Sequence, residues 1–487
     1  MKSALHWLKY LTIVAALFFV AQYILLALLR ISYPFELEWM EGSMVDHVQR
    51  VLDGKSLYVP PTIDFVPFAY PPLYFYLSAG LAKVTGIGFL PLRLISLLSS
   101  LGALWLIALI VRKETGKSSY GILAAGLFAA TYRACGAWLD IGRVDSLLLL
   151  LLLGAVYLLR VHDTRRGAAI AGLLLALAVL TKQTAIVVAG PLFLYIVLTR
   201  RDLFGWAVTP FMVVAGGALL ALTLTTDGWF WYYNVVQPAH HAMQLFSFFF
   251  FLGHDLVATM GIATGAAVWW FWTGKAEGKT RLFYGLFVLG MALASLLPRI
   301  KAGGFANDLI PIFAALAVLF GLAASRWIES SAALRAPALL YAACLLQFVL
   351  LIYNPLRCIP TSADLEAGKA LLRKLQSQPG NVLVFSHGFL SAQSAKRPTA
   401  NCIAVTDVLS AGDPRARGAL VKDFREAIQA HRYSALILDD DDPLSWTEIA
   451  IASQYSKSEV AIENPVAFWP VSGWPTRPEW IYRPIGK

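Results

Sequence analysis

The sequence predicts a mainly α-helical, polytopic membrane protein that ends in a small α/β domain. Apolar residues make up 58% of the 487 residues and charged residues only 14%, whereas a soluble domain has about 25% charged residues. Apolar stretches that suit membrane spans recur up to residue 354, and beyond residue 355 the composition becomes that of a soluble protein. We therefore expect a membrane domain over residues 1–354 and an extracytoplasmic α/β domain over residues 355–487.

Eleven stretches are apolar enough to be spans, if spans shorter than the usual length of about 20 residues are covered by their neighbours. They are residues 8–29, 91–111, 118–137, 144–159, 167–181, 185–199, 204–225, 247–273, 281–297, 304–325 and 335–354. The first is too long for the apolar region of a signal peptide, and no small-residue cleavage site follows it. We therefore expect it to be retained as an anchor, with the amino terminus in the cytoplasm.

Short basic loops give the orientation, because Lys and Arg are retained on the cytoplasmic side. They fall at every second turn: Arg112, Lys113 and Lys117; Arg160, Arg165 and Arg166; Arg200 and Arg201; Lys275, Lys279 and Arg281; Arg326 and Arg335. This alternation requires residues 72–85 to be a juxtamembrane or re-entrant helix, and it places a long first loop, residues 30–90, outside a plasma (inner) membrane. The net charge of +10 then reflects topology and contact with membrane lipids, and nothing in it indicates nucleic acid as a partner.

The C-terminal region alternates between helical and strand patterns, which is typical of an α/β domain. Residues 364–375 and 421–431 read as amphipathic helices, and residues 381–386 and 434–438 read as buried strands. Residues 443–487 are rich in Pro and Trp and show no clear period. We expect this last segment to be irregular.

Three glutamates, Glu36, Glu38 and Glu41, directly follow the first apolar stretch. The apolar pattern of residues 44–52 predicts a helix that would place Glu38 and Glu41 on one side. A carboxylate held near apolar walls has a raised pKa and can act as a general base near neutral pH. Acids in the first turn of a helix also favour its dipole and cap free N–H groups, and this is the reading we prefer for Glu36. We predict catalytic roles for Glu38 and Glu41.

A second acidic group precedes a run of seven leucines. Asp145 stands at the mouth of a predicted span, two residues after Arg143, where it would orient an acceptor or form an ion pair with that arginine. We count Asp145 as catalytic. Contacts to the acceptor or its sugar are predicted for Asp140, Arg143, Tyr70 and Tyr74.

Polar and basic residues gather at the outer ends of the predicted spans, where Arg and Lys suit a phosphate group. The predicted donor-phosphate ligands are Arg93, Lys182, His240, His241, Arg299, Lys301 and Asn307. Cations that merely snorkel to lipid headgroups are the alternative for any one of them. The two adjacent histidines would point apart in regular structure, which disfavours a metal site there.

No cofactor is predicted. The sequence contains no Gly-rich phosphate loop, no Ser nucleophile elbow and no HExxH motif, and its four cysteines lack metal-ligand spacing. A divalent metal stays possible without support from the sequence. Cys358 and Cys402 both belong to the outward-facing domain, where an oxidising compartment would allow a disulfide, and the sequence leaves that pairing open.

Several motifs together resemble the GT-C glycosyltransferases of the family 39 type, which include protein O-mannosyltransferases and the lipid A aminoarabinose transferase. Early acids in a long first loop are followed by Tyr-Pro-Pro-Leu-Tyr-Phe-Tyr at residues 70–76 and by Arg93 at the start of a span. Arg143-Val-Asp145 is similar to the second acidic motif of the family. Residues 180–184 look like its Thr-Lys element, and residues 301–311 look like a late motif of bacterial members.

The resemblance implies inverting transfer of a sugar from a polyprenyl-phosphate-linked donor to a glycan, lipid or protein acceptor at the outer face of the cell-envelope membrane. A first-loop carboxylate would act as base, and basic residues would stabilise the departing phosphate. In the family an Asp often precedes the Glu, whereas here Met40 precedes Glu41 and Glu38 lies two residues further back. The choice between Glu38 and Glu41 therefore stays open.

Two other functions fit parts of the sequence. A lipid-linked polysaccharide ligase or polymerase would use a similar basic cavity at the outer face but would not need the first-loop acids. A lipid or solute transporter would need polar groups deep within its spans on both sides of the midplane, and the loops assigned here to the cytoplasm are short and merely basic.

Overall fold

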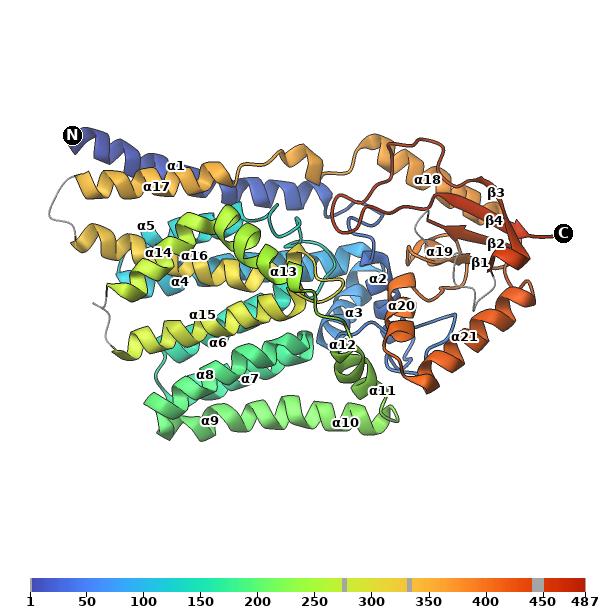
Figure 1. The fold of residues 1–487 in the computed structure, drawn as a ribbon, viewed down its shortest axis with the longest axis horizontal. Helices are drawn as coiled ribbons and strands as arrows, with labels where there is room; N and C mark the ends of the chain where they lie inside the picture. Colours follow the sequence, from blue (N-terminus) through green and yellow to red (C-terminus); the bar gives the residue numbers. More distant parts are fainter. Residues whose placement is uncertain (1, 274–277, 331–334, 440–450, 487) are drawn as a thin grey trace.

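A computed structural model describes residues 2–486 except 274–277, 331–334 and 440–450. A bundle of helices forms one part of the molecule, and a smaller domain with a mixed sheet lies at one end of it (Figure 1). Buried apolar side chains form a contiguous core that includes residues of both parts. Lys275, assigned above to a cytoplasmic loop, lies outside the described residues.

Each of the eleven predicted spans coincides with helical structure. The first six correspond, in order, to α1 (Lys2–Arg30), α4 (Phe89–Thr115), α5 (Ser118–Ala130), α6 (Asp145–Val161), α7 (Arg165–Thr181) and α8 (Ile186–Thr199). The 3-10 turn η1 (Gln183–Ala185) directly precedes α8. The later ones are α9 (Arg201–Phe211) with α10 (Gly217–Thr225), α13 (Leu245–Phe250) with α14 (Thr259–Trp272), α15 (Gly278–Arg299), α16 (Ile310–Ser330) and α17 (Arg335–Leu350). The π-helical turns η2 (Met212–Gly216) and η4 (Phe251–Ala258) join the two paired helices.

By length and hydropathy, six of the helices in the described residues can each cross a membrane, or up to seven if one bent pair counts as a span. The apolar part of α16 is wholly buried inside the bundle, so its neighbours rather than lipid cover it. The protein is thus a multi-pass membrane protein, and the count of eleven spans stays a prediction.

One predicted span boundary is wrong. The stretch 118–137 is helical only as far as Ala130. Gly136 and Ala137 adopt positive φ angles of 75° and 56°, which a right-handed helix cannot accommodate. The chain therefore turns here and brings residues 131–144 to the end of the bundle as an irregular segment.

The first outer loop contains two helices, α2 (Glu41–Leu52) and α3 (Leu73–Thr85). Helix α2 buries Met44, Val45 and Val48 from its apolar pattern, and α3 packs against α2 and α4. Residues 72–85 thus form the separate short helix that the charge alternation required. Three short helical segments, α11 (Trp229–Trp231), η3 (Tyr232–Val236) and α12 (Gln237–Ala239), follow α10.

The C-terminal domain is α/β, as predicted. It contains the helices α18 (Ser362–Ser377), α19 (Leu390–Gln393), α20 (Cys402–Ser410), α21 (Pro414–Gln429) and α22 (Ile451–Gln454) and the strands β1 (Val382–Val384), β2 (Ala435–Leu438), β3 (Tyr455–Val460) and β4 (Trp480–Pro484). The strand order is β1-β2-β4-β3, with β1 parallel to β2 and β4 antiparallel to its two neighbours. A capping box between Thr361 and Asp364 fixes the start of α18.

The expectation that residues 443–487 are irregular is wrong, because this segment supplies β3 and β4. Strand β3 lies at the sheet edge and buries only its first residue well, so it carries neither the alternation nor the apolar run that marks a strand. Residues 443–450 lie outside the described part of the chain.

Candidate active site

Glu41 anchors the first outer loop to the bundle through Arg93 on α4. The guanidinium donates to both carboxylate oxygens, at 2.8 and 2.7 Å, and also to the backbone carbonyls of Tyr33 and Phe35. Backbone N–H groups of Leu37 and Gly142 donate to the same carboxylate. Burial acts to raise the pKa of Glu41, but Arg93 outweighs it and the pKa is lowered. Both partners are fully buried, and their hydrogen-bonding groups are used in holding the loop.

Glu38 lies just before α2 and has a different environment. Its Oε2 accepts a hydrogen bond of 2.7 Å from Arg143 Nη1, whereas within the described residues its Oε1 has no hydrogen-bond partner. The side chain is fully buried. Burial raises the pKa of Glu38 to about 7, with Arg143 opposing the rise and Glu41 adding to it. Glu38 therefore combines an available oxygen with a pKa near neutrality.

Besides Glu38, Arg143 contacts two aromatic residues. Its Nη2 donates to the hydroxyl of Tyr70 at 2.8 Å, and its guanidinium lies 5.0 Å from the centre of the Trp138 ring. The indole Nε1 of Trp138 donates to Asp145 Oδ2 at 3.0 Å. Trp138 thus links the Glu38–Arg143 pair to a second buried group around Asp145.

That second group brings three distant segments together. Asp145 opens α6, Lys182 follows α7, and Asn307 lies in the 3-10 turn η5 (Ala306–Leu309) before α16. Asp145 Oδ1 accepts from Lys182 Nζ at 2.9 Å and from Asn307 Nδ2 at 3.2 Å, and Lys182 also lies 3.3 Å from Asp308. The group holds one ammonium between two carboxylates.

The remaining predicted phosphate ligands lie on neighbouring segments. Arg299 pairs with Asp255 at 2.8 Å, and Lys301 Nζ donates to the carbonyl of Pro238 at 2.7 Å. His240 bonds its own helix at the carbonyl of Val236, and His241 lies 3.3 Å from Asp407. Lys301 therefore contacts a neutral carbonyl rather than a carboxylate.

Two of the predicted site residues belong to other contacts. Asp140 accepts from Arg30 at 2.6 and 2.7 Å and from Tyr132, in a pair that ties α1 to the segment after α5. The hydroxyl of Tyr74 bonds the carbonyl of Leu92 and lies 2.9 Å from Ser96 Oγ, so it fastens α3 to α4. The structure thus joins Tyr70, but not Tyr74 or Asp140, directly to the Glu38–Arg143 pair.

Trp138 and Asp308 are two site residues that were not predicted from the sequence. Trp138 lies seven residues before Asp145, and Asp308 directly follows Asn307. Their places in two already selected stretches were the only signals, since neither has a motif or spacing of its own.

No metal site is formed by the described residues: they contain no group of three or more His, Cys, Asp or Glu side chains arranged to hold an ion. Cys358 and Cys402 form no disulfide. The pairing that the sequence left open is therefore not made.

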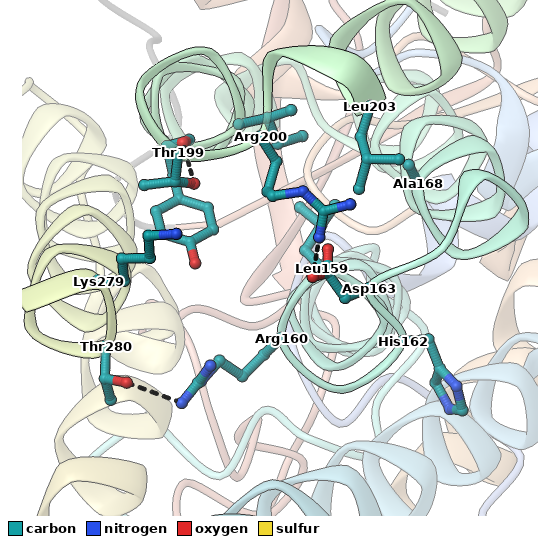
Figure 2. Close-up of a pocket in the computed structure, with 12 residues that line it drawn as sticks. Leu159, Arg160, His162, Asp163, Ala168, Thr199, Arg200, Leu203, Lys279 and Thr280 are labelled. Atoms are coloured by element: carbon teal, nitrogen blue, oxygen red, sulfur yellow. Dashed lines mark hydrogen bonds and ion pairs between the residues drawn. The ribbon is translucent and has the colours of Figure 1, made fainter. Parts of the chain in front are cut away.

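A cavity of about 230 Å³ lies at the other end of the bundle, where α6, α8 and α15 meet. Figure 2 shows Arg160 reaching Thr280 and Arg200 reaching Asp163, with Lys279 beside them. None of the predicted site residues lines this cavity. Its basic lining supplies matched controls for variants of the candidate active site.

Comparison with known proteins addresses the fold. A family model described as dolichyl-phosphate-mannose-protein mannosyltransferase matches residues 69–231. The structure is similar to ArnT from Cupriavidus metallidurans bound to undecaprenyl phosphate, with a TM-score of 0.61, 14% identity, and coverage of 96% of this chain and 97% of ArnT. ArnT in the apo state gives a TM-score of 0.62 at the same identity and coverage. No curated protein matches the sequence.

A second kind of enzyme shares the architecture. The oligosaccharyltransferase of Archaeoglobus fulgidus matches with a TM-score of 0.52 and 11% identity, over 86% of this chain and 69% of that protein. The chain has the GT-C fold. This confirms the resemblance found in the sequence. Helix α2, which begins three residues after Glu38, lies at the end of the bundle that carries the C-terminal domain (Figure 1).

Proposed function

We propose that this protein is an inverting glycosyltransferase that moves a sugar from a polyprenyl-phosphate-linked donor to an acceptor at the extracytoplasmic face of the membrane. The observation that carries the proposal is that Oε1 of the buried Glu38 has no hydrogen-bond partner among the described residues of a chain with the GT-C fold. The description of the matching family model includes a dolichyl-phosphate sugar, and ArnT was seen with undecaprenyl phosphate. Both support a lipid-linked donor.

Glu38 is the proposed general base, in preference to Glu41. An acceptor hydroxyl would donate its hydrogen bond to Glu38 Oε1 and lose its proton to it while the hydroxyl oxygen attacks the anomeric carbon. The bond from that carbon to the phosphate oxygen breaks, and the polyprenyl phosphate leaves. A single displacement of this kind inverts the configuration at the anomeric carbon. Glu41 is unsuited to this role because four N–H groups, two of them from Arg93, already occupy its oxygens.

Lys182 and Asn307 are the proposed ligands of the donor phosphate. Both converge on Asp145 Oδ1, so Asp145 positions them, while a phosphate would replace the more distant Asp308 as a partner of the ammonium. Since two carboxylates face this one ammonium, further positive charge is needed. Lys301, which has a carbonyl as its partner, is the proposed source, with Arg299, His240 and His241 on the adjoining segments. Arg93 is not included, because its N–H groups hold the first loop.

The test uses purified protein in lipid vesicles with a labelled polyprenyl-phosphate sugar. We expect Glu38→Gln to lower the rate of transfer by about 10²–10⁴-fold, the usual contribution of a general base, with little change in thermal stability. Glu366→Gln is the matched control, since that carboxylate is exposed at the surface of the C-terminal domain. Transfer at the wild-type rate in Glu38→Gln would falsify the assignment of the base.

We propose that the amino terminus lies in the cytoplasm of a cell with this protein in its plasma (inner) membrane, and that the C-terminal domain lies outside. The basic cavity around Arg160, Arg200 and Lys279, at the end of the bundle away from that domain, supports this sidedness. A cysteine introduced at the exposed Lys422 would be labelled in intact cells by a membrane-impermeant maleimide. Labelling only after cell lysis would contradict the topology.

A further inference from the structure

A short segment of the C-terminal domain, Val471–Thr476, lies against the first outer loop beside Glu38. We call this segment the strap. In Figure 1 the dark red chain between β3 and β4 runs from the sheet back toward the bundle. The strap backbone bonds the loop, since the N–H of Ser472 donates to the carbonyl of Leu37 at 3.1 Å and Ser472 pairs with Glu38 in a parallel bridge. The Ser472 hydroxyl also donates to the carbonyl of Gly136.

The strap approaches Glu38 closely at Gly473. Its φ angle is 79°, and a Cβ atom at this position would lie 2.7 Å from Glu38 Cγ and 2.9 Å from Trp39 Cδ1. Both the backbone conformation and the lack of space require glycine here. The strap backbone is therefore in contact with the side chain of the proposed base and helps to enclose it.

A chain of four side chains, three of them buried and the fourth, Glu36, partly buried, fastens the end of the strap to the first loop. The hydroxyl of Thr476 donates to Asp439 Oδ2, and the same oxygen lies 3.0 Å from His387 Nε2. His387 Nδ1 lies 2.6 Å from Glu36 Oε2. Glu36 in turn accepts the N–H of Gly42 in the first turn of α2, the capping role that the sequence predicted for it. We call Glu36, His387, Asp439 and Thr476 the latch.

The latch brings together charges that fit one another. Burial lowers the pKa of His387, but Asp439 and Glu36 outweigh it, so the pKa lies well above its usual value. The imidazolium then donates from both nitrogens to the two carboxylates. His387 and Asp439 follow β1 and β2, which are parallel neighbours. The two residues therefore lie beyond the carboxyl ends of adjacent strands, on the same side of the sheet.

Enclosure by the strap conflicts with catalysis in one respect. Glu38 is fully buried, yet its Oε1 must meet an acceptor hydroxyl. We propose that the strap is a gate on the acceptor side of the site, which the latch holds closed and which opens to admit the acceptor. This inference rests on the proposed function, because it takes Glu38 as the base.

A closed gate has a chemical purpose. Water that reached Glu38 Oε1 would be activated as an acceptor hydroxyl is: its proton passes to Glu38, its oxygen bonds to the anomeric carbon, and the bond to the polyprenyl phosphate breaks. The donor would then be hydrolysed to free sugar. Exclusion of water by a closing segment is a known means of preventing such side reactions. His387 is in this view a positioning residue that acts through the strap.

The experiment loosens the latch at its strap end in the full-length protein. Thr476→Val removes the hydroxyl with little change in shape, and Thr476→Ser restores it. Thr399→Val is the matched control, since it removes another buried hydroxyl from the same domain, one that bonds the carbonyl of Val384 away from the strap. Hydrogen exchange of residues 470–476, donor affinity, and the ratio of donor hydrolysis to transfer are measured for each variant.

We expect Thr476→Val to raise both the exchange rate of the strap amides and the hydrolysis-to-transfer ratio by about tenfold, the effect of losing one buried hydrogen bond. Donor affinity should not change, and Thr476→Ser and Thr399→Val should match the wild type. His387→Asn should change both quantities in the same direction but by more, because it breaks the same chain and also leaves two carboxylates without their cation. Wild-type exchange in Thr476→Val overturns the latch.

The two arms separate this inference from the proposed function. If Thr476→Val speeds exchange of the strap amides but leaves the hydrolysis-to-transfer ratio unchanged, the latch does hold the strap, but the strap is not a gate that excludes water. If the wild-type protein neither transfers nor hydrolyses the sugar, the proposed function fails. The exchange rates, which need no substrate, still decide whether the latch holds the strap.

Discussion

Two buried glutamate–arginine pairs join the first outer loop to other segments and differ in one respect. In the Glu41–Arg93 pair, every carboxylate oxygen and the guanidinium have partners that hold the loop to α4. In the Glu38–Arg143 pair, Glu38 Oε1 and Arg143 Nε have no hydrogen-bond partner within the described residues. Both pairs have 2.7 Å contacts and almost no exposure.

If Glu38 is the base that we propose, burial and ion pairing do not by themselves distinguish a structural carboxylate from a reactive one. The pKa shifts take opposite directions, lowered for Glu41 and raised to about 7 for Glu38, because only Glu41 collects enough donors to offset its burial. An oxygen left without a donor is costly in a buried site. Glu38 therefore has the property expected of a group that awaits a substrate.

The largest effect is expected from breaking the Glu41–Arg93 pair, in which both carboxylate oxygens have hydrogen-bond donors. Arg93→Met leaves the Glu41 carboxylate buried without its cation, which costs about 3–5 kcal/mol. We expect a large drop in the melting temperature of the detergent-solubilised protein and loss of folded material. Arg160→Met is the control, because that arginine pairs with the partly exposed Glu114 at the other end of the bundle. Equal melting temperatures for the two variants would refute the anchoring role of Arg93.

The next largest effect concerns the donor phosphate. Lys182→Met removes the ammonium that Asp145 and Asp308 hold, and we expect the kcat/KM for the donor to fall by about 10²–10³-fold, the usual cost of losing one charge-stabilising group. Lys279→Met, in the cavity at the far end (Figure 2), should leave kcat/KM unchanged. A similar loss in both variants would point to a general effect of charge on the membrane protein rather than to a phosphate site.

Much of the fold could be predicted because apolar stretches and charge alternation are local signals. All eleven stretches are helical over most of their length, and α2 and the separate α3 are where the pattern placed them. The error at residues 131–137 came from an apolar run that Gly136 and Ala137 turn away from the helix. The missed strand β3 has mostly exposed polar residues and is held by its pairing with β4.

The partners of the site residues could not be predicted, because they are far apart in the sequence. Asp145 and Arg143 are near neighbours and were considered a pair, yet Asp145 bonds Lys182, 37 residues away, and Arg143 bonds Glu38, 105 residues away. His387 and Glu36 are separated by 351 residues. The sequence indicates which residues are candidates. Tertiary packing decides which of them have all their hydrogen-bond partners and which keep an atom without one.

A smaller effect is expected on the pH dependence of the transfer rate. It tests the Glu38–Arg143 pair, which we call the open pair because Glu38 Oε1 has no hydrogen-bond partner within the described residues. The base acts when ionised, and since the pKa of Glu38 is raised to about 7, transfer at limiting donor should fall about tenfold per pH unit below that value. Arg143 lowers this pKa, so Arg143→Met should move the midpoint of the profile upward. A profile that stays flat from about pH 5 to 8 would exclude Glu38 as the titrating base, whereas Glu41, with its lowered pKa, would contribute no change in this range.

The smallest effect separates two tyrosines of the same aromatic stretch. Tyr70→Phe removes the hydroxyl that accepts from Arg143 and keeps the ring, so Arg143 is positioned less firmly against Glu38. We expect kcat to fall by about three- to tenfold, the effect of one hydrogen bond of ordinary strength, with a shift in the pH midpoint. Tyr74→Phe breaks bonds to Leu92 and Ser96 between α3 and α4 and should lower the melting temperature slightly while leaving the pH profile in place. If the two variants change the pH profile alike, then Tyr70 acts only through packing, and the open pair extends no further than Glu38 and Arg143.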